Sequence, residues 1–130
     1  MLPAVAVVRL LLLLLLPRGV AALQNGLGIK PPRGWRSWNE FGDDINQATF
    51  EAQAEALASR NRTVNGVATS LADLGFVGIG VDDGWQMCNS GPGGTGFHNA
   101  SGYPIVNTSR FPDIRSMTAK AKMLGLRPGW

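Results

Sequence analysis

The chain has 130 residues, of which 45% are hydrophobic and 16% are charged, and its formal net charge is +3. This length and composition fit one small globular domain. The positive charges form no cluster of Lys and Arg, which excludes the electrostatic footprint of a nucleic-acid-binding protein.

Residues 1–22 have the pattern of a secretory signal peptide. A run of leucines, Leu10–Leu16, is followed by small residues that favour cleavage after Ala22. A membrane anchor is the alternative, but a spanning helix needs about 20 apolar residues, and Arg9 and Pro17 interrupt this run. We expect a cleaved signal, no stable membrane anchor, and a protein of the secretory pathway that is extracellular, lysosomal or vacuolar.

An irregular lead-in and a first strand are expected next. Gln24 to Pro32 is rich in Gly and Pro. Gly34 to Phe41 alternates aromatic with polar residues, which predicts a short strand that runs into a loop.

Two helical segments are predicted after this strand. The first covers residues 45–59, with Asn46 as its candidate N-cap. Its apolar residues recur at helical spacing: Phe50, Ala54 and Leu57. After an interruption at 60–66, residues 67–74 are predicted to resume the helix, which Gly75 ends as a C-cap.

The most informative stretch is the strand predicted over Phe76 to Val81, where bulky residues alternate with glycine. It is followed by Asp82 and Asp83, and where a chain leaves a sheet both carboxylates can turn toward one pocket. Carboxylates accept hydrogen bonds from sugar hydroxyls, and the indole of Trp85 offers an apolar wall. The alternative is a plain Asp-Asp-Gly turn.

Residues 87–104 are predicted to form a long loop. Gly91 to Gly96 lacks the Lys-Ser or Lys-Thr and the helix that follow the glycines of a phosphate-binding loop. The dinucleotide fingerprint also fails, because its glycines would lie inside the predicted strand. His98 has no Cys or His at metal-ligand spacing. We therefore expect neither a metal nor a cofactor.

Three Asn-x-Ser/Thr sequons begin at Asn61, Asn99 and Asn107, and each is a candidate glycosylation site in an exported glycoprotein. Cys88 is the only cysteine, so the chain can form no internal disulfide bond. In an exported protein a lone thiol indicates a disulfide partner elsewhere, and a buried free thiol is the alternative.

A last helix and strand complete the chain. The helix is predicted to start at Phe111-Pro112-Asp113, with Pro112 near the first turn and Asp113 favourably placed against the helix dipole. Its apolar stripe is Ile114, Met117, Ala121 and Leu124. Gly125 ends the helix, and Leu126 to Trp130 starts a strand that we expect to be cut short. Strands and helices in alternation indicate parallel β/α units.

Four segments, in order, resemble motifs of glycoside hydrolase family 27, the melibiases. Pro31–Asn39 is similar to the family's Pro-Pro-Met-Gly-Trp opening, Val81–Trp85 to its Asp-Asp-Cys-Trp signature, Asn107–Pro112 to its Arg-Phe-Pro segment, and Gly125–Gly129 to its Gly-Leu-Lys-x-Gly segment. Two positions depart from the family. Arg33 replaces Met, and Gly84 replaces the signature Cys, so the family's disulfide from that position is absent.

The resemblance implies an α/β fold, the (β/α)₈ TIM barrel, with its site at the C-terminal ends of the strands. Residues 23–130 would be the amino-terminal part of this catalytic barrel, truncated after two β/α units and the start of the third strand. Carried over by position, Trp38, Asp82 and Asp83 would bind galactose, and Trp85 would support the pocket wall.

The implied activity is that of an α-galactosidase, a retaining hydrolase that removes terminal α-linked galactose from oligosaccharides or glycoconjugates. The resemblance places its nucleophile and acid/base on strands four and six, so no catalytic residue is expected in these 130 residues and the chain alone is predicted to be inactive. A homodimer is one expected assembly of the full-length enzyme. The alternatives are α-N-acetylgalactosaminidase and a galactose-binding product without catalysis.

Overall fold

The computed structural model describes residues 25–130, and the chain divides into two units, Met1–Lys30 and Pro31–Trp130. The expected signal peptide lies outside the described residues. Residues 25–33 contain neither helix nor strand, which confirms the irregular lead-in over this part.

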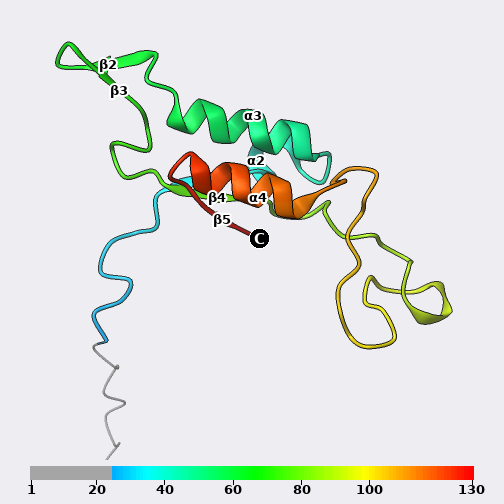
Figure 1. Cartoon of the computed structure of the whole chain (residues 1–130). Coiled ribbons are helices and arrows are strands. Elements are labelled where there is room, and N and C mark those ends of the chain that lie inside the picture. Colours follow the sequence, from blue (N-terminus) through cyan, green and yellow to red (C-terminus); the bar gives the residue numbers. More distant parts are fainter. Residues whose placement is uncertain (1–24) are drawn as a thin grey trace, which may run out of the picture. The chain divides into compact units, whose positions relative to one another are not determined.

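The second unit is built on a three-stranded parallel sheet (Figure 1). Its strands are β1 (Gly34–Arg36), β4 (Gly78–Gly80) and β5 (Arg127–Gly129), in the spatial order β1-β4-β5. β1 and β4 approach so closely at the Gly34↔Gly78 pair that a Cβ on Gly34 would lie 2.0 Å from the carbonyl oxygen of Gly78. Only glycine permits this approach.

Two helices connect successive strands of the sheet. α3 (Gln47–Ala58) leads from β1 toward β4, and α4 (Ile114–Met123) leads from β4 to β5. The two helices pack side by side (Figure 1) and share one core with β4. The buried apolar side chains of this core are Ile45, Phe50, Ala54, Leu57, Ile79, Val81, Phe111, Met117, Ala121 and Leu126. The prediction of an α/β fold with parallel strands is confirmed.

Both helices begin at side-chain caps. Asn46 Oδ1 accepts a hydrogen bond from the backbone N–H of Thr49 at 2.9 Å, as the sequence predicts. Asp113 is itself the N-cap of α4, because its Oδ1 accepts from the N–H of Ser116 at 2.9 Å. Pro112 directly precedes this N-cap, so it lies next to the first turn, as the sequence predicts.

The predicted helix over 67–74 is wrong. β2 (Arg62–Val64) and β3 (Val67–Thr69) form an antiparallel hairpin instead, and a turn follows before Gly75. The reason is the Asn65-Gly66 dipeptide, whose φ angles of 51° and 79° belong to the two-residue turn that joins paired strands. In the turn that follows, Leu71 packs against the core, whereas Leu74 is exposed, so their helical spacing does not mark one buried helix face.

The loop predicted after β1 is also wrong, because α2 (Trp38–Phe41) forms directly after Ser37. Gly42, with φ of 54°, ends this short helix. The long loop over 87–104 is confirmed, and one 3-10 turn, η1 (Pro92–Gly94), lies within it.

α3 and α4 are joined by an ion pair as well as by their apolar contacts. The carboxylate of Glu51 accepts from Gln47 Nε2 at 2.8 Å and from Lys120 Nζ at 3.0 Å. The hydrogen bond from Gln47, followed by that from Lys120, lowers the pKa of Glu51 below the ordinary 4.5. Its contribution to stability is therefore fully present above pH 4.5 and is lost as the pH falls through the lowered pKa.

We expect Glu51→Gln to lower the thermal midpoint of unfolding by a few degrees at pH 7, because one of the two carboxylates that pair with Lys120 is removed and only Glu55 remains. The difference from the wild type should shrink as acid protonates Glu51 in the wild type. Circular dichroism melts from pH 7 to pH 3 measure it, with the exposed Glu40→Gln as a control. A difference that stays constant over this range would contradict the assignment.

Candidate functional site

The candidate site lies at the carboxyl edge, by which we mean the edge of the sheet where β1, β4 and β5 end. Because the strands are parallel, their carboxyl ends meet at this one edge. Trp38 lies two residues after β1, and Asp82 and Asp83 follow β4 by two and three residues. The structure thus brings the segments that carry these predicted binding residues to the same edge.

Ser37 joins the ends of β1 and β4. Its backbone N–H donates to the carbonyl of Gly80 at 3.1 Å, and its Oγ accepts from the N–H of Asp82 at 2.9 Å. The side chain is completely buried, so water does not compete for these bonds. No role was predicted for Ser37, although it lies inside the motif at Pro31–Asn39.

The carboxylate of Asp82 lies beside Arg36. Arg36 Nη1 donates to the carbonyl of Val81 at 3.2 Å and lies 3.9 Å from Asp82 Oδ2. Because the side chain of Asp82 is 41% exposed, this pair is weak and leaves carboxylate oxygens open to a ligand. The guanidinium orients Asp82 without covering it.

Asp83 and Trp38 are more exposed than Asp82. Asp83 Oδ1 accepts from the neighbouring N–H of Gly84 at 2.9 Å, and within residues 25–130 its second carboxylate oxygen makes no hydrogen bond. Trp38 begins α2 and is 51% exposed. An acceptor pair and an open indole at one edge suit a ring with hydroxyls on one side and C–H groups on another.

Trp85 belongs to an aromatic group at the base of the long loop. Its ring centroid lies 6.2 Å from that of Phe97, in an edge-to-face arrangement, and 6.4 Å from that of Trp130. Its backbone carbonyl accepts from the N–H of Asn107 at 2.8 Å. Trp85 is half-buried and ties the loop to the end of β5, which fits a supporting position better than direct contact with a ligand.

Gly84 packs against the loop that follows α2. Its φ is +90°, and a Cβ at this position would lie 2.2 Å from the carbonyl oxygen of Asp43. The same carbonyl accepts from Arg110 Nη1, while Arg110 Nη2 lies 3.5 Å from Asp44 Oδ1. Arg110 therefore ties the segment before α4 to this loop, a contact that the sequence did not predict.

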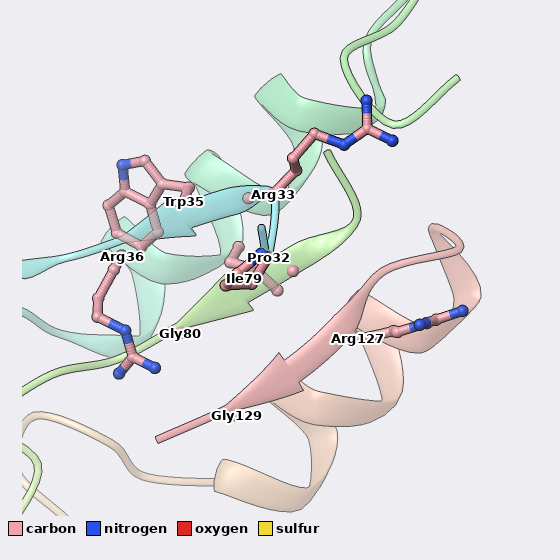
Figure 2. A pocket seen from close by; sticks show the side chains of 10 residues that line it. Pro32, Arg33, Trp35, Arg36, Ile79, Gly80, Arg127 and Gly129 are labelled. Atoms are coloured by element: carbon pink, nitrogen blue, oxygen red, sulfur yellow. The ribbon is translucent and has the colours of Figure 1, made fainter. Parts of the chain in front are cut away.

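The sheet also carries an open hollow of about 300 Å³, lined by Pro32, Arg33, Gly34, Trp35, Arg36, Gly78, Ile79, Gly80, Arg127 and Gly129. Figure 2 shows that the side chains of Arg33, Arg36 and Arg127 point away from one another, so they form no common anion site. Asp82 and Asp83 do not line this hollow. We therefore place the candidate site at the carboxyl edge and not here.

Other chemistry is sparse in the part that the structure describes. Within residues 25–130 no three His, Cys, Asp or Glu side chains are grouped as metal ligands. None of the helices in this range has the length and apolar character needed to cross a bilayer. Cys88 is exposed, so the alternative of a buried free thiol is wrong.

Gly84→Ala should lower the thermal midpoint more than Gly93→Ala. Both positions have positive φ, at +90° and +73°, so both variants carry backbone strain of about 1 to 2 kcal/mol. Only the methyl at 84 meets another segment, which adds about 1 to 3 kcal/mol of overpacking. Melting curves of both variants measure the difference, and equal losses would show that Gly84 is needed for its φ alone.

No family model matches the chain. An α-galactosidase of Cyamopsis tetragonoloba is 41% identical over 81 residues, which are 62% of this chain and 18% of that protein. An α-galactosidase of Coffea arabica is 34% identical over 108 residues, which are 82% of this chain and 24% of that protein. The chain thus spans a quarter or less of the length of these relatives.

Solved structures of α-galactosidases also match most of this chain. α-Galactosidase I of Mortierella vinacea matches with a TM-score of 0.61 and 29% identity over 82% of this chain and 23% of its own. The raffinose-bound α-galactosidase of Saccharomyces cerevisiae matches with a TM-score of 0.61 over 81% of this chain and 20% of its own, and at 22% identity it supports the fold alone. Over the matched stretch the chain is α-galactosidase-like, and its resemblance to glycoside hydrolase family 27 is confirmed.

Proposed function

We propose that the chain supplies the galactose-binding part of an exported, retaining α-galactosidase. The observation that carries this proposal is the link through Ser37, which sets Asp82 beside the start of the segment that bears Trp38. A carboxylate pair and an open indole meet there at the carboxyl edge of a parallel sheet.

The order of the strands supports a (β/α)₈ barrel. Each strand of the parallel sheet lies next to the one that precedes it in the β/α series, and a helix leads from each to the next. This stepwise order builds a barrel wall, whereas a doubly wound sheet reverses direction at its centre. In barrel enzymes the site lies at the carboxyl ends of the strands, where Asp82 and Asp83 lie.

The chemistry of the edge suits a sugar more than an ion. Asp82 and Asp83 offer acceptors for several hydroxyls, and Trp38 offers a face for the C–H side of the ring. Trp85, which packs against Phe97 and Trp130, would support the wall from behind. These contacts would strengthen as the ring approaches its oxocarbenium-like transition state.

Asp82 and Asp83 bind and do not catalyse in this proposal. A retaining mechanism needs two carboxyl groups about 5 to 5.5 Å apart, on opposite sides of the anomeric carbon. Adjacent residues at one strand end approach the ring from one side. The nucleophile and the acid/base would come from strands four and six of the barrel, so residues 25–130 alone would bind sugar without cleaving it.

The proposed substrates are α-galactosides with a terminal galactose. The relatives named above, which are 34 and 41% identical to this chain over the matched stretches, are α-galactosidases. α-N-Acetylgalactosaminidase is the alternative within the family. The full-length protein should therefore hydrolyse p-nitrophenyl α-galactoside faster than p-nitrophenyl α-N-acetylgalactosaminide.

In the full-length protein we expect Asp82→Ala to lower kcat/KM for p-nitrophenyl α-galactoside by about 10- to 100-fold, since each hydrogen bond to a charged group contributes about 1.5 to 3 kcal/mol. Steady-state hydrolysis measures it. The control is Asp44→Asn, which removes an exposed carboxylate of the neighbouring loop. Equal rates for Asp82→Ala and the wild type would contradict a binding role for Asp82.

A further inference from the structure

We infer that Asn61, at the start of the β2–β3 hairpin, carries an N-linked oligosaccharide. The inference concerns a covalent modification and goes beyond the proposed hydrolysis. It rests on the export proposed above, and on the surroundings of the three sequons in the structure.

The hairpin lies far from the carboxyl edge. It connects the end of α3 to the segment that leads into the beginning of β4, so it belongs to the opposite edge of the sheet (Figure 1). Figure 1 also shows the hairpin and the long loop after β4 at opposite ends of the paired helices α3 and α4. An oligosaccharide on the hairpin would leave Asp82 and Asp83 accessible.

The sequon at Asn61 is fully presented to solvent. Residues 61–68 are all exposed. Thr63 lies in β2 and pairs with Ala68, and Asn61 directly precedes this strand. Neither side chain takes part in a hydrogen bond within residues 25–130, so the amide and the hydroxyl that define a sequon are both available.

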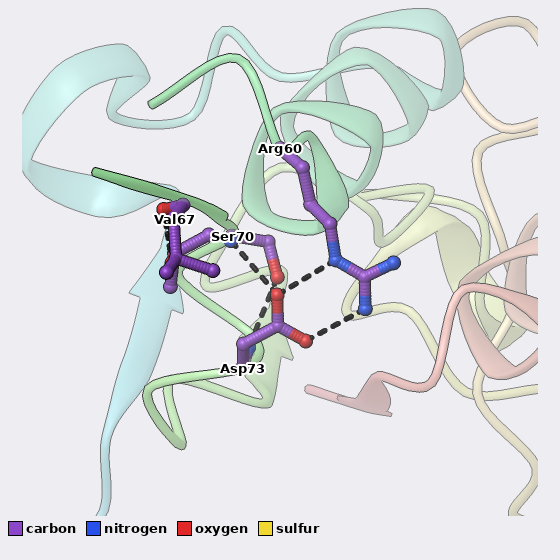
Figure 3. A network of polar contacts seen from close by, with 5 residues as sticks. Arg60, Val67, Ser70 and Asp73 are labelled. Atoms are coloured by element: carbon purple, nitrogen blue, oxygen red, sulfur yellow. Dashed lines mark hydrogen bonds and ion pairs between the residues drawn. The ribbon is translucent and has the colours of Figure 1, made fainter. Parts of the chain in front are cut away.

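The base of the hairpin is fixed, which holds the sequon away from the core. Arg60 Nε and Nη2 donate to the two carboxylate oxygens of Asp73 at 2.8 and 2.9 Å (Figure 3). Ser70 and Asp73 exchange two further bonds, Ser70 N–H to Asp73 Oδ2 at 2.9 Å and Asp73 N–H to Ser70 Oγ at 3.0 Å. The hydrogen bond from Arg60 is the main cause of the lowered pKa of Asp73. The carboxylate of Asp73 therefore stays ionised, and its pair with Arg60 persists, at the pH of the secretory pathway.

The other two sequons take part in the fold. Asn107 is half-buried, its Oδ1 accepts from Ser109 Oγ at 2.6 Å, and its backbone N–H donates to the carbonyl of Trp85 at 2.8 Å. Asn99 is exposed, but its Oδ1 accepts from the N–H groups of Ser101 and Tyr103 at 2.9 and 3.0 Å. A sugar on Asn99 or Asn107 would have to be accommodated beside these contacts, whereas the side chain of Asn61 makes none within residues 25–130.

The modification is a transfer from a lipid-linked oligosaccharide pyrophosphate. A bond forms between Asn61 Nδ2 and the anomeric carbon of the oligosaccharide, and the bond from that carbon to the pyrophosphate oxygen breaks. Nδ2 loses one proton to solvent, and the lipid pyrophosphate leaves with the electron pair of the broken bond. Thr63 supplies the hydroxyl that the transferase recognises in the sequon.

Translation of the whole chain in the presence of endoplasmic-reticulum microsomes tests the inference. In a background of Asn99→Gln and Asn107→Gln, the chain should gain the mass of one oligosaccharide, and peptide N-glycosidase F should remove it. Adding Asn61→Gln should abolish the gain. In the wild-type chain, mass spectrometry after the same enzyme should find residue 61 converted from Asn to Asp.

Two variants at Thr63 separate the sequon from a change of the hairpin. Thr63→Ser keeps the hydroxyl and should keep the oligosaccharide, whereas Thr63→Val keeps the shape and should lose it. An unmodified residue 61 in the wild-type chain would overturn the inference, and this includes a chain that never enters the microsomal lumen.

Discussion

The site depends on the close pairing of β1 with β4, which begins at Gly34 and Gly78 and carries both strands to the carboxyl edge. Gly34 and Gly78 let the two backbones meet without side chains between them, and Ser37 then bonds both to Gly80 and to Asp82. These bonds are buried, so replacing Ser37 would leave a donor of the Asp82 backbone unpaired. The position of the carboxylates follows from backbone contacts and not from their own side-chain bonds.

Because backbone contacts hold the carboxyl edge in place, its side chains are not needed for this and remain open to water. Arg36 Nη1 lies 3.9 Å from Asp82 Oδ2, and both side chains are partly exposed, so the ion pair is weak. A ligand that binds the carboxylate of Asp82 would therefore lose little by disturbing this pair. The carbonyl of Asp43 accepts from Arg110 and lies where a Cβ on Gly84 would be. The rigid part of the edge is thus backbone, and the chemically useful groups project from it.

Local signals in the sequence predicted much of this fold. The candidate N-cap at Asn46 predicted α3, and the apolar stripe that starts at Ile114 predicted α4. The alternation of bulky residues with glycine predicted β4. The prediction of a helix over 67–74 was wrong because the Asn65-Gly66 turn favours a hairpin more strongly than the spacing of the leucines favours a helix. Asp82 and Asp83 were predicted as residues at a strand end, and Trp38 was predicted from the family resemblance. The roles of Ser37 and Arg110 depend on partners 45 and 67 residues away, and no local pattern reveals them.

The central claim is that this chain is the sugar-binding part of a retaining α-galactosidase. The most direct measurement is the sequence of the transcript on the 3′ side of the Trp130 codon. The account predicts an open reading frame that continues through the remaining strands and encodes two further carboxylates at the ends of strands four and six. A stop codon immediately after Trp130 would contradict it, because the carboxylates that perform the hydrolysis would have no source in the protein.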